Sequence, residues 1–207
     1  MGDIREQVKE YYSKMSIDNG GEMATHTCSC GTDSLPQYIK DVLAEIPEEI
    51  TSRFYGCGSP LPPALEGRTV LDLGCGTGRD VYLASKLVGP EGKVIGVDMN
   101  SDQLAFAKSH QAEMAAKFYN NVEFVESYIE DLSAIPGGSV DVVISNCVIN
   151  LSPMKEQVFK EIWRVLKIGG ELYFADIFAD RRVPKEINEN PLLLGECLGG
   201  AMYIEDF

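Results

Sequence analysis

Basic side chains are scarce in this 207-residue chain. It has 18 Lys and Arg against 32 Asp and Glu, which gives a formal net charge of −14. Nucleic acids and anionic membranes bind basic surfaces, so this composition argues against both as partners. A neutral or cationic small ligand fits the charge better.

Long hydrophobic runs are also missing. No apolar stretch reaches the roughly 20 residues that a transmembrane helix needs, and the N-terminal sequence "MGDIREQVKEYYSKM" is polar and acidic, unlike a signal peptide. We therefore expect a cytoplasmic protein, in a compartment where thiols stay reduced. The sequence leaves the oligomeric state open.

The cysteines lack the spacing of a zinc finger. Only two of them are close in sequence, in a C-x-C pair, and no C-x-x-C pair occurs. A framework of three disulfides is not expected in a cytosolic chain of this size. Zinc held by Cys28, Cys30 and Cys57 stays as a weaker alternative. The six cysteines are Cys28, Cys30, Cys57, Cys75, Cys147 and Cys197.

Apolar strands and amphipathic helices alternate from residue 69 onward. This alternation predicts a mostly parallel α/β sheet with helices on both faces, in which ligands bind beyond the carboxyl ends of the strands. The expected strands are 69–73, 93–98, 122–126, 140–145 and 171–176, and the expected helices are 79–88, 101–118 and 154–167. Before them we expect helices over 3–15 and 35–46 and a short helix that starts at Pro47.

The stretch "TVLDLGCGTGRD" is the strongest motif. An apolar strand that contains Asp72 is followed by Gly74, Gly76 and Gly78, which let the backbone turn tightly and approach a ligand closely. The spacing is G-x-G-x-G, because Arg79 stands where a dinucleotide fingerprint has its third glycine. This spacing argues against a nicotinamide cofactor.

This motif resembles the first motif of class I S-adenosylmethionine (SAM) methyltransferases, which have a Rossmann-like fold. The strand "KVIGVDMN" then ends in Asp98, a position suited to bind ribose hydroxyls. The alternative is a generic Rossmann-like sheet without this cofactor. The resemblance implies that SAM is bound by Tyr55, Asp72, Gly74, Gly76, Gly78, Asp98, Met99, Ile129, Glu130 and Asn146.

Three cysteines are placed where they can meet at one ligand-facing rim. Cys147 follows the fourth strand, Cys57 lies in a Gly/Pro-rich loop before the sheet, and Cys197 follows the fifth strand. Each alone is more often an inert buried thiol. Three converging thiols would instead form a site for a soft, thiophilic centre.

The segments "FYGCG" (54–58), "SNCVINL" (145–151) and "GECLGGA" (195–201) are similar to those of arsenite methyltransferases. The resemblance implies that Cys57, Cys147 and Cys197 bind As(III), and that Cys28 or Cys30 is a further cysteine that can pair with Cys57 or hand the metalloid to it. It also implies arsenite or its thiol conjugates as substrate, SAM as cofactor, and a reductant such as glutathione or thioredoxin.

The same resemblance predicts how the chain is organised. Residues 1–66 would carry lid cysteines, 67–183 would form the SAM-binding core, and 184–207 would start a substrate-binding segment. The five expected strands are fewer than a class I sheet normally has. Two other functions stay open: methylation of another small molecule with SAM, and binding or sensing of As(III) without turnover.

Overall fold

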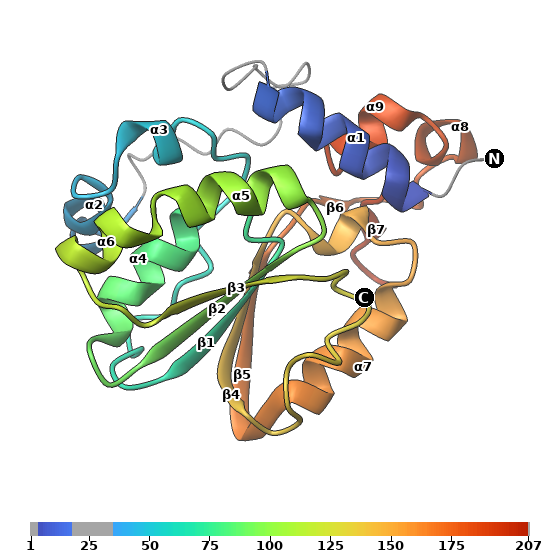
Figure 1. Cartoon of the computed structure of the whole chain (residues 1–207). Coiled ribbons are helices and arrows are strands. Elements are labelled where there is room, and N and C mark those ends of the chain that lie inside the picture. The colour runs from blue at the N-terminus through green and yellow to red at the C-terminus, as the bar shows by residue number, and fades with distance from the viewer. Residues whose placement is uncertain (1–3, 18–34, 207) are drawn as a thin grey trace.

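A parallel sheet forms the centre of the molecule (Figure 1). The computed structural model describes residues 4–17 and 35–206. Its five-stranded sheet has the order β3-β2-β1-β4-β5, and every neighbouring pair is parallel. The strands are β1 (Thr69–Leu73), β2 (Lys93–Asp98), β3 (Val122–Glu126), β4 (Val140–Asn146) and β5 (Leu166–Ala175). The predicted α/β class and all five strands are therefore confirmed.

Helices cover both faces of this sheet. Consecutive residues of a strand point to opposite faces, so Val70 belongs to the core beneath α2 and α4, whereas Leu71 belongs to the core beneath α7. The helices are α1 (Ile4–Ile17), α2 (Gln37–Leu43), α3 (Glu48–Thr51), α4 (Arg79–Val88), α5 (Ser101–Ser109), α6 (Gln111–Lys117), α7 (Lys155–Val165), α8 (Lys185–Asn188) and α9 (Pro191–Gly195), with a 3-10 turn η2 (Ile149–Leu151).

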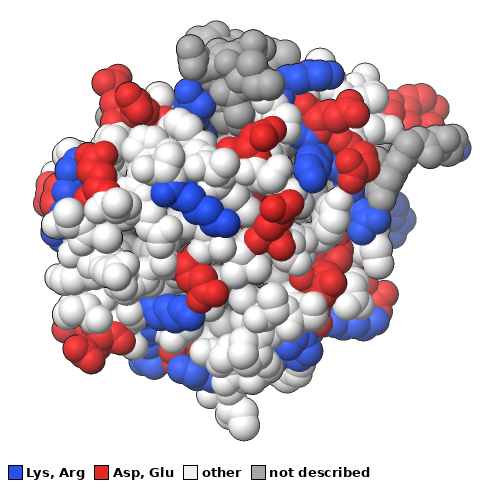
Figure 2. Space-filling view, in the orientation of Figure 1, with Lys and Arg blue, Asp and Glu red and all other residues white. Residues whose placement is uncertain are grey.

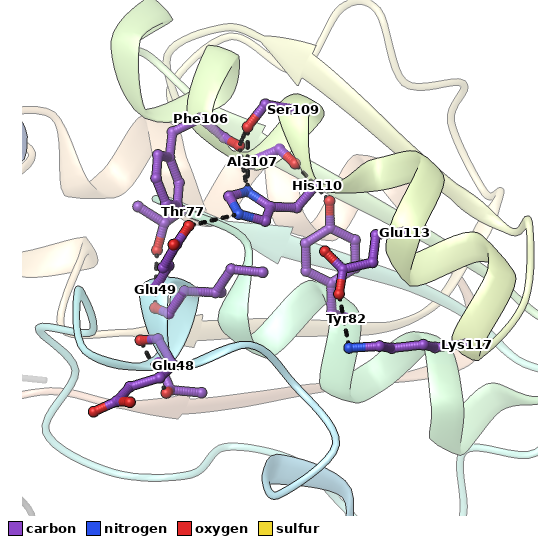
Figure 3. Close-up of polar contacts among 12 residues, drawn as sticks. Glu48, Glu49, Thr77, Tyr82, Phe106, Ala107, Ser109, His110, Glu113 and Lys117 are labelled. Carbon is purple, nitrogen blue, oxygen red and sulfur yellow. Dashed lines mark hydrogen bonds and ion pairs between the residues drawn. The ribbon is translucent and has the colours of Figure 1, made fainter.

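The helix expected over 101–118 is broken at His110. The hydroxyl of Ser109 donates to the Phe106 carbonyl at 2.6 Å, and Nδ1 of His110 lies 3.1 Å from the same oxygen (Figure 3). The backbone N–H of His110 then bonds to the carbonyl of Ala107. Side chains that compete for backbone groups weaken a helix, which explains why α5 ends and α6 begins here. Nε2 of His110 also lies 3.4 Å from a carboxylate oxygen of Glu49, so the break faces α3.

Strand β5 begins at Leu166, earlier than the expected residue 171. The pairing with β4 shifts register, because Val140 faces Leu166 whereas Val142 faces Glu171. Such a bulge takes up extra residues without moving the paired strand, and a hydrophobic period does not reveal it. A second sheet joins β6 (Phe178–Ala179) to β7 (Met202–Tyr203); strands this short have no period to recognise.

None of the described helices is long and apolar enough to cross a membrane. On the face of the molecule in Figure 2, Lys and Arg side chains are interspersed with Asp and Glu side chains. The N-terminal helix α1 packs against α9 near the other end of the chain (Figure 1). Helices α1 and α9, near the two ends of the described chain, thereby lie together near the carboxyl ends of the central strands.

Candidate active site

A cleft opens at the carboxyl ends of the central strands. Among the residues predicted to bind the cofactor, all except Gly78 line it: Tyr55, Asp72, Gly74, Gly76, Asp98, Met99, Ile129, Glu130 and Asn146. The cleft lies where ligands bind in open parallel sheets.

The glycine loop approaches the cleft with its backbone. Gly74 and Gly76 both have positive φ values, +71° and +53°, which side chains adopt only with strain. A Cβ atom on Gly74 would also lie 2.4 Å from the side chain of Val148. Gly78 instead precedes α4, and a Cβ there would lie within 3.3 Å of Tyr82 and Phe124. Its role is therefore to let the helix pack closely rather than to line the cleft.

Asp98 ties the end of β2 to the glycine loop. One carboxylate oxygen accepts the backbone N–H of Gly76 at 2.8 Å, and the other accepts that of Asn100 at 2.8 Å. Burial raises the pKa of Asp98, and these backbone donors oppose the rise. Two further buried acids, Asp72 and Asp80, also have raised pKa values, first because of burial. These three carboxyl groups line the cleft, which suits a ligand with positive charge.

The hydroxyl group of Tyr55 faces the cleft region without a hydrogen-bond partner among the described residues. Its oxygen is buried, although the side chain lines the cleft. A buried polar group normally has a partner. A ligand in the cleft could supply one, so this hydroxyl is consistent with the predicted contact between Tyr55 and a cofactor.

The three predicted cysteines do meet. Cys57 and Cys147 form a disulfide, and the thiol of Cys197 donates to the backbone carbonyl of Cys147 at 2.9 Å. The sequence left open whether these cysteines form disulfides, and in this structure the loop of Cys57 lies on the end of β4 with Cys57 bonded to Cys147. Cys147 and Cys197 both have positive φ values, 56° and 64°. Such backbone conformations in residues other than glycine concentrate at functional sites.

Asp176 is a member of this cluster that the sequence analysis missed. Carboxylate oxygen and sulfur atoms of Asp176, Cys147 and Cys197 all lie within 4.8 Å of one another. Burial raises the pKa of Asp176 to about 6, against hydrogen bonds from Asn150 and the nearby charge of Lys155. Asp176 directly follows β5, so an acid at a strand end, the pattern that identified Asp98, is the signal that could have found it.

Helix α1 contacts both the cleft and the segment that carries Cys197. Its residues Lys9 and Tyr12 line the cleft, while the hydroxyl of Tyr11 donates to Glu196 at 3.0 Å and that of Tyr12 to the Gly195 carbonyl at 3.0 Å. These two hydroxyls tie α1 to the segment that carries Cys197. The predicted cysteines Cys28 and Cys30 lie outside the described residues.

Comparison with known protein families identifies the class. A family model described as a methyltransferase domain matches residues 65–207. The chain therefore belongs to the methyltransferase domain family, in agreement with its parallel sheet, its glycine loop and the cleft at the strand ends.

Individual relatives show a more specific similarity, to arsenite methyltransferases. The chain is 47% identical to the arsenite methyltransferase of Aquipseudomonas alcaligenes, over 99% of this chain and 59% of that protein. It is 42% identical to the human arsenite methyltransferase, over 97% of this chain and 55% of that protein. The crystal structure of an arsenic (III) S-adenosylmethionine methyltransferase from Chlamydomonas reinhardtii superimposes with a TM-score of 0.79 and 48% identity, covering 84% of this chain and 60% of that one. These relatives confirm the resemblance found in the sequence, and the chain spans less than two thirds of their length.

Proposed function

We propose that this protein transfers a methyl group from SAM to trivalent arsenic held by the thiolates of Cys57, Cys147 and Cys197. The meeting of these three side chains is the observation that carries the proposal. They come from separate segments of the chain and lie together beside the cleft. Soft sulfur ligands in this number suit a thiophilic centre such as As(III).

The residues of the cleft fit SAM. The carboxyl groups that line the cleft suit its sulfonium, Asp98 suits the ribose, and the hydroxyl of Tyr55 offers an unused donor. Met99 and Ile129 offer apolar contact for the adenine, and Gly74 and Gly76 let the backbone approach. SAM would supply an electrophilic methyl group when it is bound. The contribution of the protein is chiefly position, because holding two reactants in line replaces a bimolecular encounter.

Arsenite binding requires a reduced site. The disulfide between Cys57 and Cys147 must take up two electrons and two protons to give two thiols, and a thiol reductant such as glutathione or thioredoxin would supply them. Each thiol then displaces one hydroxide of arsenous acid, which leaves as water. The lone pair that stays on arsenic is the nucleophile, so the arsenic itself needs no general base.

Other parts of the proposal rest on the sequence. Cys28 or Cys30 would pair with Cys57 or pass the arsenic to it. Residues 1–66 would carry the lid cysteines, 67–183 the cofactor core and 184–207 the start of the substrate-binding segment. A cytoplasmic location would supply the reductant.

The test is methyl transfer by the purified chain. We expect labelled methyl groups from SAM to appear on arsenic in the presence of arsenite and glutathione. Cys147→Ser and Cys197→Ser should abolish the product, whereas Cys75→Ser, at a thiol that belongs to the hydrophobic core, should keep it. Full activity in Cys147→Ser would overturn the proposed ligand set. Tight arsenite binding without methylated product would identify a binding protein instead.

A further inference from the structure

Asn146 makes four hydrogen bonds with its side-chain amide. Its oxygen accepts the backbone N–H of Cys57 at 3.0 Å and that of Gly58 at 3.2 Å. Its nitrogen donates to the carbonyl of Gly58 at 2.8 Å and to a carboxylate oxygen of Asp80 at 3.0 Å. The orientation of the amide is fixed, because the two backbone N–H groups can only donate and therefore require the oxygen.

These four contacts use the whole hydrogen-bonding capacity of the amide. A primary amide has two N–H donors and an oxygen that accepts two bonds, and protein groups occupy all of them. Although Asn146 lines the cleft, its amide therefore has nothing left to offer a cofactor. The cofactor contact that the resemblance implied for Asn146 would have to break a bond that the structure already contains.

The hydrogen bonds of Asn146 connect its own strand with two other parts of the site. Asn146 ends β4 and precedes Cys147, so it shares the backbone of one thiol. Cys57 and Gly58 carry the opposite thiol. Asp80 lies in the first turn of α4, directly after the glycine loop. One side chain thus connects both cysteines of the disulfide to the helix that begins at the cofactor cleft.

The loop of Cys57 also packs closely on this side chain. A Cβ atom at Gly56 would lie 2.6 Å from Cγ of Asn146 and 2.2 Å from the ring of Phe54. Any side chain larger than hydrogen at residue 56 would push the loop away from the amide. Contacts to Asn146 at Gly56 and Gly58 therefore hold Cys57 from both sides, in addition to the disulfide.

We infer that Asn146 is a positioning residue that holds Cys57 beside Cys147, and that it does not bind the cofactor directly. When the disulfide is reduced, the same hydrogen bonds keep the Cys57 loop on the end of β4. The two thiols then stay close enough to bind one thiophilic atom together. The part of this inference that concerns arsenite rests on the proposed function.

The experiment compares Asn146→Ala and Asn146→Asp with Ser145→Ala as the matched control. Ser145 is the neighbouring residue of β4, and its hydroxyl makes a single 3.5 Å contact with the carbonyl of Leu73. Asn146→Asp keeps an oxygen for the backbone N–H groups of Cys57 and Gly58 but cannot donate to the Gly58 carbonyl or to Asp80. Circular dichroism and a thermal melt show whether each variant has folded.

The first readout is the stability of the disulfide in glutathione buffers, with mass mapping of the Cys57–Cys147 pair. Oxidation of these two thiols converts one glutathione disulfide into two glutathione molecules. We expect the equilibrium constant for this oxidation to fall about tenfold in Asn146→Ala, as expected when about 1.4 kcal/mol of positioning is lost. Asn146→Asp should fall less, and Ser145→Ala should match the wild type. A wild-type equilibrium in Asn146→Ala would overturn the inference whether or not the chain methylates arsenic.

The second readout separates the two ligands. In the reduced chain, we expect Asn146→Ala to weaken arsenite binding about tenfold while the dissociation constant for SAM stays within about twofold of the wild type. The reverse pattern, with SAM affinity lost and arsenite affinity retained, would show that Asn146 binds the cofactor and would contradict the inference. Absence of arsenite binding in the wild type would overturn the proposed function, and the glutathione readout would then decide on Asn146 alone.

Discussion

The hydroxyl of Tyr11 offers a sharp test of how α1 holds the segment that carries Cys197. Glu196 is 0% exposed, and Tyr11 donates to its carboxylate at 3.0 Å across 185 residues of sequence. Burial, followed by the hydrogen bond and the negative charge of Glu196, raises the pKa of Tyr11, so the tyrosine stays a donor through the whole neutral range. We predict that Tyr11→Phe destabilises the fold.

The magnitude follows from the acceptor. A hydrogen bond to a charged group contributes about 1.5–3 kcal/mol, whereas one between neutral groups contributes about 0.5–1.5 kcal/mol. Tyr12 provides the matched control, because its hydroxyl donates at the same 3.0 Å distance to the neutral carbonyl of Gly195. Tyr11→Phe should therefore lower the free energy of unfolding by about 1 kcal/mol more than Tyr12→Phe does.

Urea denaturation of the two variants and the wild type, at pH 7.5 and with a reductant, measures this difference. The slope of unfolding free energy against urea should be the same in all three proteins, because no surface is newly exposed. Equal destabilisation by the two substitutions would refute the reasoning. It would mean that the carboxylate of Glu196 does not depend on Tyr11, and that α1 holds the Cys197 segment by packing alone.

Three further predictions concern the cleft and its surroundings. Both Gly74 and Gly67 have φ near +70°, but only at Gly74 would a Cβ atom meet Val148. Gly74→Ala should therefore lower the stability more than Gly67→Ala and should abolish SAM binding in calorimetry. Equal melting temperatures of the two variants would contradict this. Asp98→Asn should weaken SAM binding about 10- to 100-fold. The control Glu126→Gln, at an exposed acid that ends β3, should not change SAM affinity. A wild-type SAM affinity in Asp98→Asn would exclude the ribose contact. Burial raises the pKa of Asp176 to about 6, so between about pH 4 and 6 the folded chain keeps this proton while the unfolded chain has released it. Asp176 therefore makes the free energy of unfolding fall with rising pH in that window, by up to about 3 kcal/mol. Denaturation series should show this decrease in the wild type, and Asp176→Asn should lack this component.

Hydrophobic pattern and glycine spacing predicted the sheet and the cofactor cleft well. The reason is that a buried parallel strand must be apolar on both faces, and that a chain which turns beneath a ligand requires glycine, as at Gly74. Strand ends were equally informative, since Asp98 and Cys147 both follow apolar runs. These features depend on residues close together in sequence.

The remaining parts of the site depend on contacts between distant segments. The sequence around Tyr11 does not indicate that its hydroxyl bonds to Glu196. The sequence around Asn146 does not indicate that its amide bonds to the Cys57 loop instead of to a ligand. The disulfide between Cys57 and Cys147 also arises from tertiary packing, because 90 residues separate the two cysteines. Side-chain chemistry could be predicted from the sequence, but the partner that satisfies each group could not.

The arsenic environment in the reduced chain tests the central claim most directly. X-ray absorption at the arsenic edge, with one equivalent of arsenite on a Cys28→Ser/Cys30→Ser double variant, counts the sulfur atoms bound to arsenic when only the proposed ligands and buried Cys75 remain. We predict an all-sulfur first shell of three atoms, in which an oxygen replaces one sulfur when Cys57, Cys147 or Cys197 is changed to Ser. An oxygen-dominated shell in the double variant, or a shell unaffected by Cys147→Ser, would contradict the proposed site.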